Sequence, residues 1–241
     1  VNDIAIRFTA ERYAKFENIA IRESSICVAN SRATRADFES RYNPPPNWDC
    51  EVVHWGVDTE MFRPLDIENE QENRNFTEIR TRFGAVSPGS KLLLAVGRLA
   101  ARKGYGTLIR GFSALNKEMP NTKLVIVGRG HLKRRLMRLA KSLGVGEDIT
   151  IESSLSFAEL AQLYRSSDLV VYPSFYEGQG LIPLEAMASG VPVVTVDHGP
   201  LPEMVDESVG ALFTMGNIES MVSVMKEVLK AGRKKGEKGR A

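Results

Sequence analysis

The sequence of 241 residues is poor in the side chains that build disulfide frameworks and metal centres. Its two cysteines, Cys27 and Cys50, are too few for a disulfide framework, which argues against a small secreted scaffold. The three histidines, His54, His131 and His198, are scattered, and no His or Cys spacing matches a metal-binding pattern. We therefore expect no bound metal and a reducing, cytoplasmic setting.

Long hydrophobic runs are also missing. No stretch approaches about 18 consecutive apolar residues, so no transmembrane helix is expected. The chain starts at Val1 without a basic-then-apolar leader, so no secretory signal is visible, and we expect the sequence to be a piece of a longer protein. The hydrophobic fraction of 43% is nevertheless ample for a packed core.

Neither sign of charge is in large excess, because 32 basic residues face 30 acidic ones. Residues 230–241 alone have a basic surplus of five, so the rest of the chain carries a net charge of −3. Such a balance does not predict a nucleic-acid-binding surface. We interpret residues 232–241 as a basic flexible tail, with a nucleic-acid or membrane contact as the alternative.

What the sequence does contain is a regular alternation of apolar runs and helical patterns. The apolar runs lie at residues 92–96, 124–127, 149–151, 169–172 and 193–196. The helical stretches lie at residues 105–119, 131–144, 157–166 and 181–189. Continuous apolar strands that alternate with helices are typical of a parallel sheet covered on both faces. The sequence thus predicts an α/β fold, with a doubly wound parallel sheet over residues 75–231.

The residues before this domain show a second, shorter pattern. They predict a helix over 1–22, a strand over 25–30, a helix over 32–42 capped by Ser31, and a strand over 51–54. Residues 65–74 are acidic and almost free of apolar side chains, which is typical of a linker. We therefore interpret residues 1–64 as the end of a second, truncated α/β domain.

In doubly wound sheets, ligands bind beyond the carboxyl ends of the strands, and the loop after the run at 92–96 carries two cations there. Gly97 and Gly104 bound this loop and permit tight turns. Between them, Arg98 and Lys103 can project over the sheet edge, where a guanidinium fork and an ammonium suit phosphate oxygens. Two solvated surface cations are the alternative interpretation.

The loop after the run at 169–172 carries the richest chemistry. Gly178 and Gly180 place Glu177 in the loop, and a helix begins near Leu181, so that its free amides can bind an anion. Glu185 lies one turn inside that helix, where its carboxylate can accept hydrogen bonds from a vicinal diol such as a ribose. An acid near a helix start is also common without any function.

Two further strand-end loops are less informative. His198 is either a ligand contact or a turn residue, and the sequence does not decide between them. Gly128-Arg129-Gly130 is a weak dinucleotide fingerprint, because the third glycine would fall at Lys133, and we favour a simple turn.

Taken together, these loops resemble the retaining glycosyltransferases of family 4, which have the GT-B fold. The run from Pro173 to Glu185 resembles the family's Pro-Ser, Glu-Gly-x-Gly and a second Glu eight positions after the first, and residues 185–194 match the motif's tail. Residues 97–104 resemble the family's phosphate-contact loop. Residues 30–31 and 56–64 resemble the segment that joins the two domains of a GT-B enzyme.

The resemblance implies a role for each matched residue. It implies that the catalytic residues are Glu177, Arg98 and Lys103. It implies that the donor-binding residues are Gly97, Ser174, Gly178, Gly180, Leu181, Glu185 and His198. Arg98 and Lys103 would bind the diphosphate of a UDP- or GDP-sugar, Glu177 would lie against the sugar, and Glu185 would hold the ribose hydroxyls. A sugar would then be transferred with retention of configuration, without a metal or other cofactor.

Several alternatives stay open. Glu177 and Glu185 could form a glycosidase-like carboxylate pair. The chain could also be a non-catalytic nucleotide-sugar-binding module, because the acceptor domain that would select a carbohydrate or lipid is largely absent. Finally, the helix predicted at 132–143 alternates leucines with Lys and Arg, a pattern that a peripheral membrane contact would also show.

Overall fold

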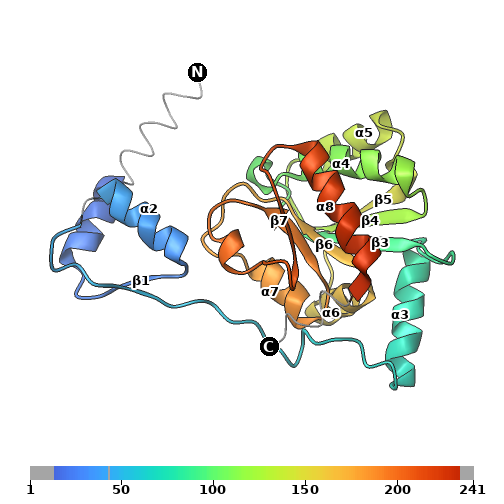
Figure 1. The fold of residues 1–241 in the computed structure, drawn as a ribbon, viewed down its shortest axis with the longest axis horizontal. Helices are drawn as coiled ribbons and strands as arrows, with labels where there is room; N and C mark the ends of the chain where they lie inside the picture. Colours follow the sequence, from blue (N-terminus) through green and yellow to red (C-terminus); the bar gives the residue numbers. More distant parts are fainter. Residues whose placement is uncertain (1–13, 43, 234–241) are drawn as a thin grey trace. The chain divides into compact units, whose positions relative to one another are not determined.

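The computed structural model describes residues 14–42 and 44–233, and the chain divides into two compact units (Figure 1). The first unit ends at Trp55 and the second begins at Gly56. The structure therefore draws the boundary earlier than the sequence interpretation, which placed residues 56–64 with the first domain. The reason is packing: buried Phe62 lies edge-on to Tyr164 of the second unit, with ring centroids 5.6 Å apart.

The first unit contains a helix over residues 14–23, β1 (Cys27–Ala29), α2 (Arg32–Tyr42) and β2 (Cys50–Val52). The two strands pair in parallel, with Cys27 opposite Cys50. As predicted, Ser31 caps α2, because its hydroxyl accepts a hydrogen bond from the Thr34 amide at 3.0 Å. The first part of the helix predicted over 1–22 lies outside the described residues.

The second unit is built around a parallel sheet. Its strands are β3 (Lys91–Val96), β4 (Thr122–Val127), β5 (Ile149–Glu152), β6 (Leu169–Tyr172), β7 (Val193–Val196) and β8 (Gly210–Phe213). Its α-helices are α3 (Glu70–Arg82), α4 (Tyr105–Glu118), α5 (Lys133–Ser142), α6 (Phe157–Ser166), α7 (Leu181–Ala188) and α8 (Ile218–Ala231). The strand order is β5-β4-β3-β6-β7-β8, and every pair is parallel. The predicted doubly wound α/β fold is confirmed.

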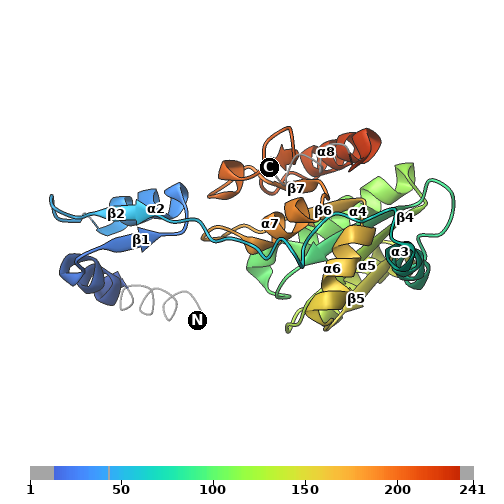
Figure 2. The same ribbon diagram turned by 90° about the horizontal axis from the view of Figure 1, so that it is seen from below.

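The alternation of side chains along each strand explains why the apolar runs are continuous. In β3, Leu93 and Ala95 join a core with α4, α5 and α8, whereas Leu92 and Leu94 join a core with α6 and α7. Helices therefore cover both faces of the sheet, as Figure 2 shows, and most strand side chains on either face are apolar. Among the described residues, no helix is long and apolar enough to cross a membrane.

The predicted linker over 65–74 is corrected by α3, which begins at Glu70. The Asn69 side chain caps this helix by accepting hydrogen bonds from the amides of Gln71 and Glu72. The helix is strongly polar and buries none of its residues fully, so its sequence carries little of the apolar periodicity that would reveal it. The segment is therefore helical without an apolar stripe.

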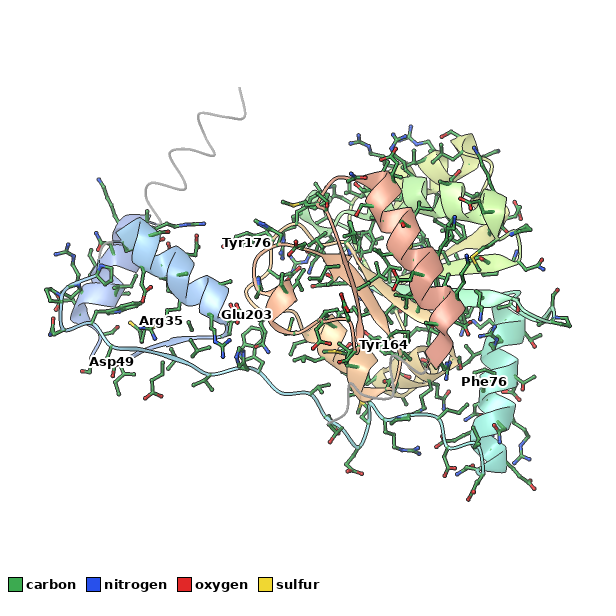
Figure 3. All side chains as sticks on the ribbon, in the orientation of Figure 1. Arg35, Asp49, Phe76, Tyr164, Tyr176 and Glu203 are labelled. Carbon is green, nitrogen blue, oxygen red and sulfur yellow. The ribbon has the colours of Figure 1, made fainter. Side chains whose placement is uncertain are left out.

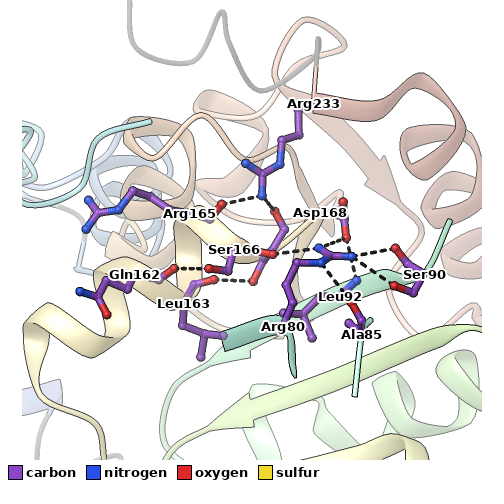
Figure 4. Close-up of polar contacts among 11 residues, drawn as sticks. Arg80, Ala85, Ser90, Leu92, Gln162, Leu163, Arg165, Ser166, Asp168 and Arg233 are labelled. Atoms are coloured by element: carbon purple, nitrogen blue, oxygen red, sulfur yellow. Dashed lines mark hydrogen bonds and ion pairs between the residues drawn. The ribbon is translucent and has the colours of Figure 1, made fainter. Parts of the chain in front are cut away.

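One arginine of α3 ties the helix to the sheet. The Arg80 guanidinium donates to the Asp168 carboxylate at 2.8 Å and to the carbonyls of Ser166 and Ser90 at 3.0 and 2.8 Å (Figure 4). Nearby, Arg233 donates to the carbonyls of Arg165 and Ser167. Arg233 was predicted to lie in the basic tail, but it is docked on this network; residues 234–241 lie outside the described part of the chain.

Candidate functional site

The topology of the sheet singles out two loops. The chain runs from β3 outward through β4 to β5, then returns to β6 beside β3 and continues outward through β7 to β8. The winding therefore reverses between β3 and β6, and such a switch point leaves a crevice at the carboxyl ends of the two strands. The loops that leave these strands are residues 97–104 and 173–180, which are the two loops that the sequence analysis selected as a candidate site.

The two loops are joined backbone to backbone. The Phe175 amide donates to the Arg102 carbonyl at 2.8 Å. Gly104 has a φ of +69°, and a Cβ added there would lie 2.1 Å from the Pro173 carbonyl oxygen, so only glycine fits. The cation loop and the carboxylate loop thus form one rigid unit.

Within this unit, Lys103 and Glu177 form a nearly buried ion pair, with 11% and 12% of their side chains exposed. The Lys103 ammonium also donates to the Tyr172 hydroxyl at 2.9 Å, and the Ser174 hydroxyl donates to the Glu177 carboxylate. Burial acts to raise the pKa of Glu177, but hydrogen bonds from Lys103, Ser174 and Tyr172 outweigh it and hold that pKa below its usual value. Glu177 is therefore an anion with a fixed orientation.

Arg98 and Lys103, which the sequence analysis treated as a pair of cations, have different surroundings. Arg98 is exposed, and no hydrogen bond or ion pair of its guanidinium is recorded within the described part of the chain. Gly97, just before it, has a φ of +139°, and a Cβ there would lie 2.9 Å from the Tyr105 hydroxyl. Arg98 is thus available to an external anion, whereas Lys103 is engaged by Glu177.

The second glutamate of the motif is in a separate environment. The Tyr164 hydroxyl donates to the Glu185 carboxylate at 2.7 Å, and Tyr164 is fully buried in the core. Burial raises the pKa of Glu185, and the hydrogen bond from Tyr164 only partly offsets it. The two glutamates therefore have pKa values that are shifted in opposite directions.

The remaining predicted site residues lie around the start of α7. The helix begins at Leu181, as predicted, after Gly180 with a φ of +105°. Gly178 lies in the loop before it. His198 is exposed in the turn after β7, and the structure gives its ring no partner among the described residues. The backbone amides of Gly178, Gly180 and Leu181 therefore lie just before or in the first turn of α7. The role of His198 stays a prediction.

The sequence analysis missed three residues of this site. The Tyr172 hydroxyl accepts a hydrogen bond from Lys103 and donates one to Glu177. Tyr105 is buried, and its hydroxyl lies beside Gly97. Arg102 donates to the Tyr176 carbonyl at 3.0 Å and its guanidinium lies 3.9 Å from the Glu177 carboxylate. Tyr176 itself is 58% exposed on the outer edge of the domain (Figure 3). Only their positions in the sequence could have indicated the two tyrosines, because Tyr172 is the last residue of β6 and Tyr105 directly follows the loop at 97–104.

The turn at Gly128-Arg129-Gly130 packs closely against the cation loop. A Cβ at Gly128 would lie 1.9 Å from the Gly97 carbonyl oxygen, and the Leu99 amide donates to the Arg129 carbonyl at 2.8 Å. The preferred interpretation of a turn holds, and its glycines let it approach the cation loop closely. Among the described residues, no group of three His, Cys, Asp or Glu side chains is placed to hold a metal ion.

Comparisons with known proteins agree with this geometry. Residues 77–239 match the family described as glycosyl transferases group 1. The D-inositol 3-phosphate glycosyltransferase of Segniliparus rotundus is 32% identical over 200 residues, which cover 81% of this chain and 42% of that protein. The GDP-mannose-dependent alpha-(1-6)-phosphatidylinositol monomannoside mannosyltransferase of Mycolicibacterium smegmatis is 31% identical over 215 residues, 86% of this chain and 53% of the relative.

A solved structure with the same fold is HepE of Anabaena in complex with UDP and glucose. It has a TM-score of 0.79 at 21% identity, over 92% of this chain and 59% of that one. The chain spans about half the length of the curated relatives described above. The fold of the second unit is that of the GT-B glycosyltransferases. The chain belongs to the glycosyl transferases group 1 family.

Proposed function

We propose that this chain is the donor-binding part of a glycosyltransferase that transfers a sugar from a nucleotide-diphosphate sugar to an acceptor with retention of configuration. The observation that supports this most strongly is the joined pair of loops at the switch point, which presents a cation, a fixed carboxylate and the N-terminus of α7 at one sheet edge. Two named transferases among the relatives, and a structural neighbour that holds UDP and glucose, support the same function.

Different residues would bind the nucleoside diphosphate and the sugar of the donor. Arg98 and the amides at the start of α7 would bind the diphosphate, where negative charge grows as the sugar leaves. Glu185, positioned by Tyr164, would accept hydrogen bonds from the ribose hydroxyls. Glu177 would face the sugar as an anion that Lys103 orients.

In the proposed reaction, the bond between the anomeric carbon and the diphosphate oxygen breaks, and the nucleoside diphosphate leaves with the electron pair. A bond from the anomeric carbon to an acceptor hydroxyl oxygen forms on the same face, and the hydroxyl proton is released. An oxocarbenium-like sugar between these events is stabilised by a nearby anion. A fixed Glu177 carboxylate supplies such an anion, and Arg98 supplies the matching cation for the leaving group.

The first unit would be the end of the acceptor-side domain, and the acceptor would be a carbohydrate or a lipid. One relative is named for inositol 3-phosphate and another for a phosphatidylinositol monomannoside, and these two names are compatible with a carbohydrate or a lipid acceptor. We also propose a cytoplasmic setting, which the free thiols of Cys27 and Cys50 support. The second candidate function is a non-catalytic nucleotide-sugar-binding module.

Titration calorimetry with UDP-glucose and GDP-mannose tests the donor site. We expect one of the two to bind, and we expect Glu185→Ala to weaken it by about tenfold or more, because a charged hydrogen-bond acceptor is lost. The matched control is Glu219→Ala, which removes an exposed acid from the first turn of α8 and should leave affinity unchanged. Equal affinity of both variants and the unaltered chain would refute the donor site.

A second measurement separates the transferase from the binding module. Release or transfer of the sugar is followed with the donor that binds, using the unaltered chain and Glu177→Ala. Turnover that Glu177→Ala abolishes supports the transferase. Binding of the donor without any release or transfer by this chain supports the module.

A further inference from the structure

The donor site leaves one unusual part of the molecule unexplained, the helix α5. Residues 129–141 contain six Lys or Arg residues and no Asp or Glu. Because the whole chain has a net charge of +2, the remaining residues together sum to −4. Positive charge is therefore concentrated on one short segment of an otherwise acidic body, which attracts anionic surfaces in one orientation.

The packing of α5 decides which of its side chains face outward. Leu136 and Ala140 are buried, and Leu132, Leu139 and Leu143 pack against the core. The leucines are therefore used by the sheet. They are not available for insertion into a bilayer, so a membrane contact of this helix has to involve its other side chains.

The outward side chains form what we call the basic face: Arg134, Arg135, Met137, Arg138 and Lys141. The four cations are exposed and Met137 is 38% exposed. No hydrogen bond or ion pair of these four cations is recorded within the described residues. Residues three and four apart share one side of a helix, so the positions from 134 to 141 form a continuous stripe. A hollow of about 850 Å³ beside it is lined by Gly130, His131, Lys133, Arg134, Met137 and Arg138.

We propose that the basic face docks the protein on a membrane surface that contains anionic lipids. Clusters of four to eight Lys or Arg on one side of a helix bind such surfaces, with each cation contributing a similar share of the attraction. The exposed Met137 in the middle of the stripe suits the boundary between headgroups and acyl chains, where an apolar side chain surrounded by cations is accommodated.

A nucleic acid is the other large polyanion that a cationic helix could meet. Base recognition by single strands relies on aromatic stacking platforms, and α5 contains no aromatic residue. The lining of the hollow beside the basic face contains the imidazole of His131 but no Phe, Tyr or Trp. The features of the face therefore favour a lipid surface over a polynucleotide.

The test is co-sedimentation of the full chain with vesicles of phosphatidylcholine alone and with about 30 mol% phosphatidylglycerol. We expect binding to the anionic vesicles only, and a loss of at least about tenfold when salt is raised from about 0.1 M to about 0.5 M. The triple variant R134E/R135E/R138E should weaken binding by at least about tenfold. The variant R134Q/R135Q/R138Q neutralises the three charges without reversing them. Its binding to anionic vesicles should lie between that of the unaltered chain and that of the charge-reversed variant.

The matched control reverses the same number of charges in the terminal segment, as K234E/K235E/K238E. It should retain most of the binding if the basic face carries the interaction. Equal binding to neutral vesicles, loss of binding in the terminal variant but not in the α5 variant, or tighter binding to a single-stranded DNA oligonucleotide would each overturn the proposal. Donor affinity measured on the α5 variants by calorimetry shows that the second unit is folded, and it separates this outcome from a failure of the donor site.

Discussion

The Lys103–Glu177 ion pair gives the sharpest test of how the candidate site is held together. The perturbation is Lys103→Met, which keeps most of the aliphatic stem and removes the ammonium. In the unaltered protein, 11% of the Lys103 side chain and 12% of the Glu177 side chain are exposed, so neither charge is well solvated by water. Removing the cation leaves a nearly buried carboxylate with the hydroxyls of Ser174 and Tyr172 as hydrogen-bond partners and the half-exposed Arg102 guanidinium 3.9 Å away.

The size of the effect follows from burial. Removing one partner of a fully buried ion pair costs about 3–5 kcal/mol, and slight exposure reduces this to about 2–3 kcal/mol here. In the unaltered protein the pKa of Glu177 is lowered in the folded state, so the carboxylate stabilises the fold above its unfolded pKa, and this stabilisation is lost as the pH falls through the folded pKa. In Lys103→Met the pKa of Glu177 rises, because burial is no longer opposed by an ammonium.

The difference in free energy of unfolding between the two proteins should therefore be largest near pH 7. It should shrink as the pH falls, because the Glu177 carboxylate is protonated at a higher pH in the variant than in the unaltered protein. Urea unfolding at several pH values measures it. Far-UV circular dichroism is the suitable signal, since both tryptophans, Trp48 and Trp55, lie in the first unit and the site lies in the second.

A matched control comes from Lys123, which pairs with Asp148 at 2.6 Å with side chains 25% and 22% exposed. Lys123→Met should cost only about 1 kcal/mol, because water solvates both partners better. A loss in Lys103→Met that is no larger than in this control, or that does not change with pH, would refute the account of Glu177 as a buried anion that depends on its cation.

Three further predictions concern neighbouring parts of the domain. Gly104→Ala should destabilise the second unit by more than about 2 kcal/mol in thermal unfolding, because the backbone is left-handed and the added Cβ would collide with the Pro173 carbonyl; a loss under about 1 kcal/mol would contradict the close contact of the two loops. Tyr164→Phe removes the hydrogen bond that lowers the pKa of Glu185, so this pKa should rise further, and donor affinity followed by calorimetry should begin to fall at a higher pH than in the unaltered protein. Ser156→Ala removes a capping box at the start of α6 and should cost about 1 kcal/mol in urea unfolding, with donor affinity unchanged.

Much of the fold was predictable because a parallel sheet covered on both faces leaves a strong pattern in the sequence. The strands β3 and β6, for example, are apolar on every residue in their interior, and the loops that follow them break the runs with Gly97 and Pro173. By contrast, α3 has no apolar stripe, and its first residues, 70–74, were interpreted as part of a linker. Its stability comes from Arg80 and from the Asn69 cap, and both depend on partners or backbone geometry that hydrophobic periodicity does not report.

The loops of the candidate site were found for a different reason. Their position after strands made them candidates, and the spacing of Glu177 and Glu185 made them specific. What could not be predicted is which charged groups meet. Lys103 and Glu177 are 74 residues apart, and their contact depends on β3 and β6 being neighbours in the sheet, which is a property of the topology. Tyr172 was missed for the same reason, because a tyrosine at the end of an apolar strand is indistinguishable from a core residue in sequence.

The pairing of Lys103 with Glu177 also changes how the charge of the site should be understood. Two cations on the first loop predict a positively charged crevice, yet one of them is already neutralised by a carboxylate from the second loop. In the proposed function, the local field that an incoming diphosphate meets would then be set mainly by Arg98 and by the N-terminus of α7. Lys103 acts instead on the orientation of Glu177, since an ammonium fixed by a carboxylate and a tyrosine hydroxyl has little freedom to follow a ligand. In the proposed function, attraction of the donor would thus be separated from positioning of the anion beside the sugar, and the two tasks would fall to two cations five residues apart on one loop.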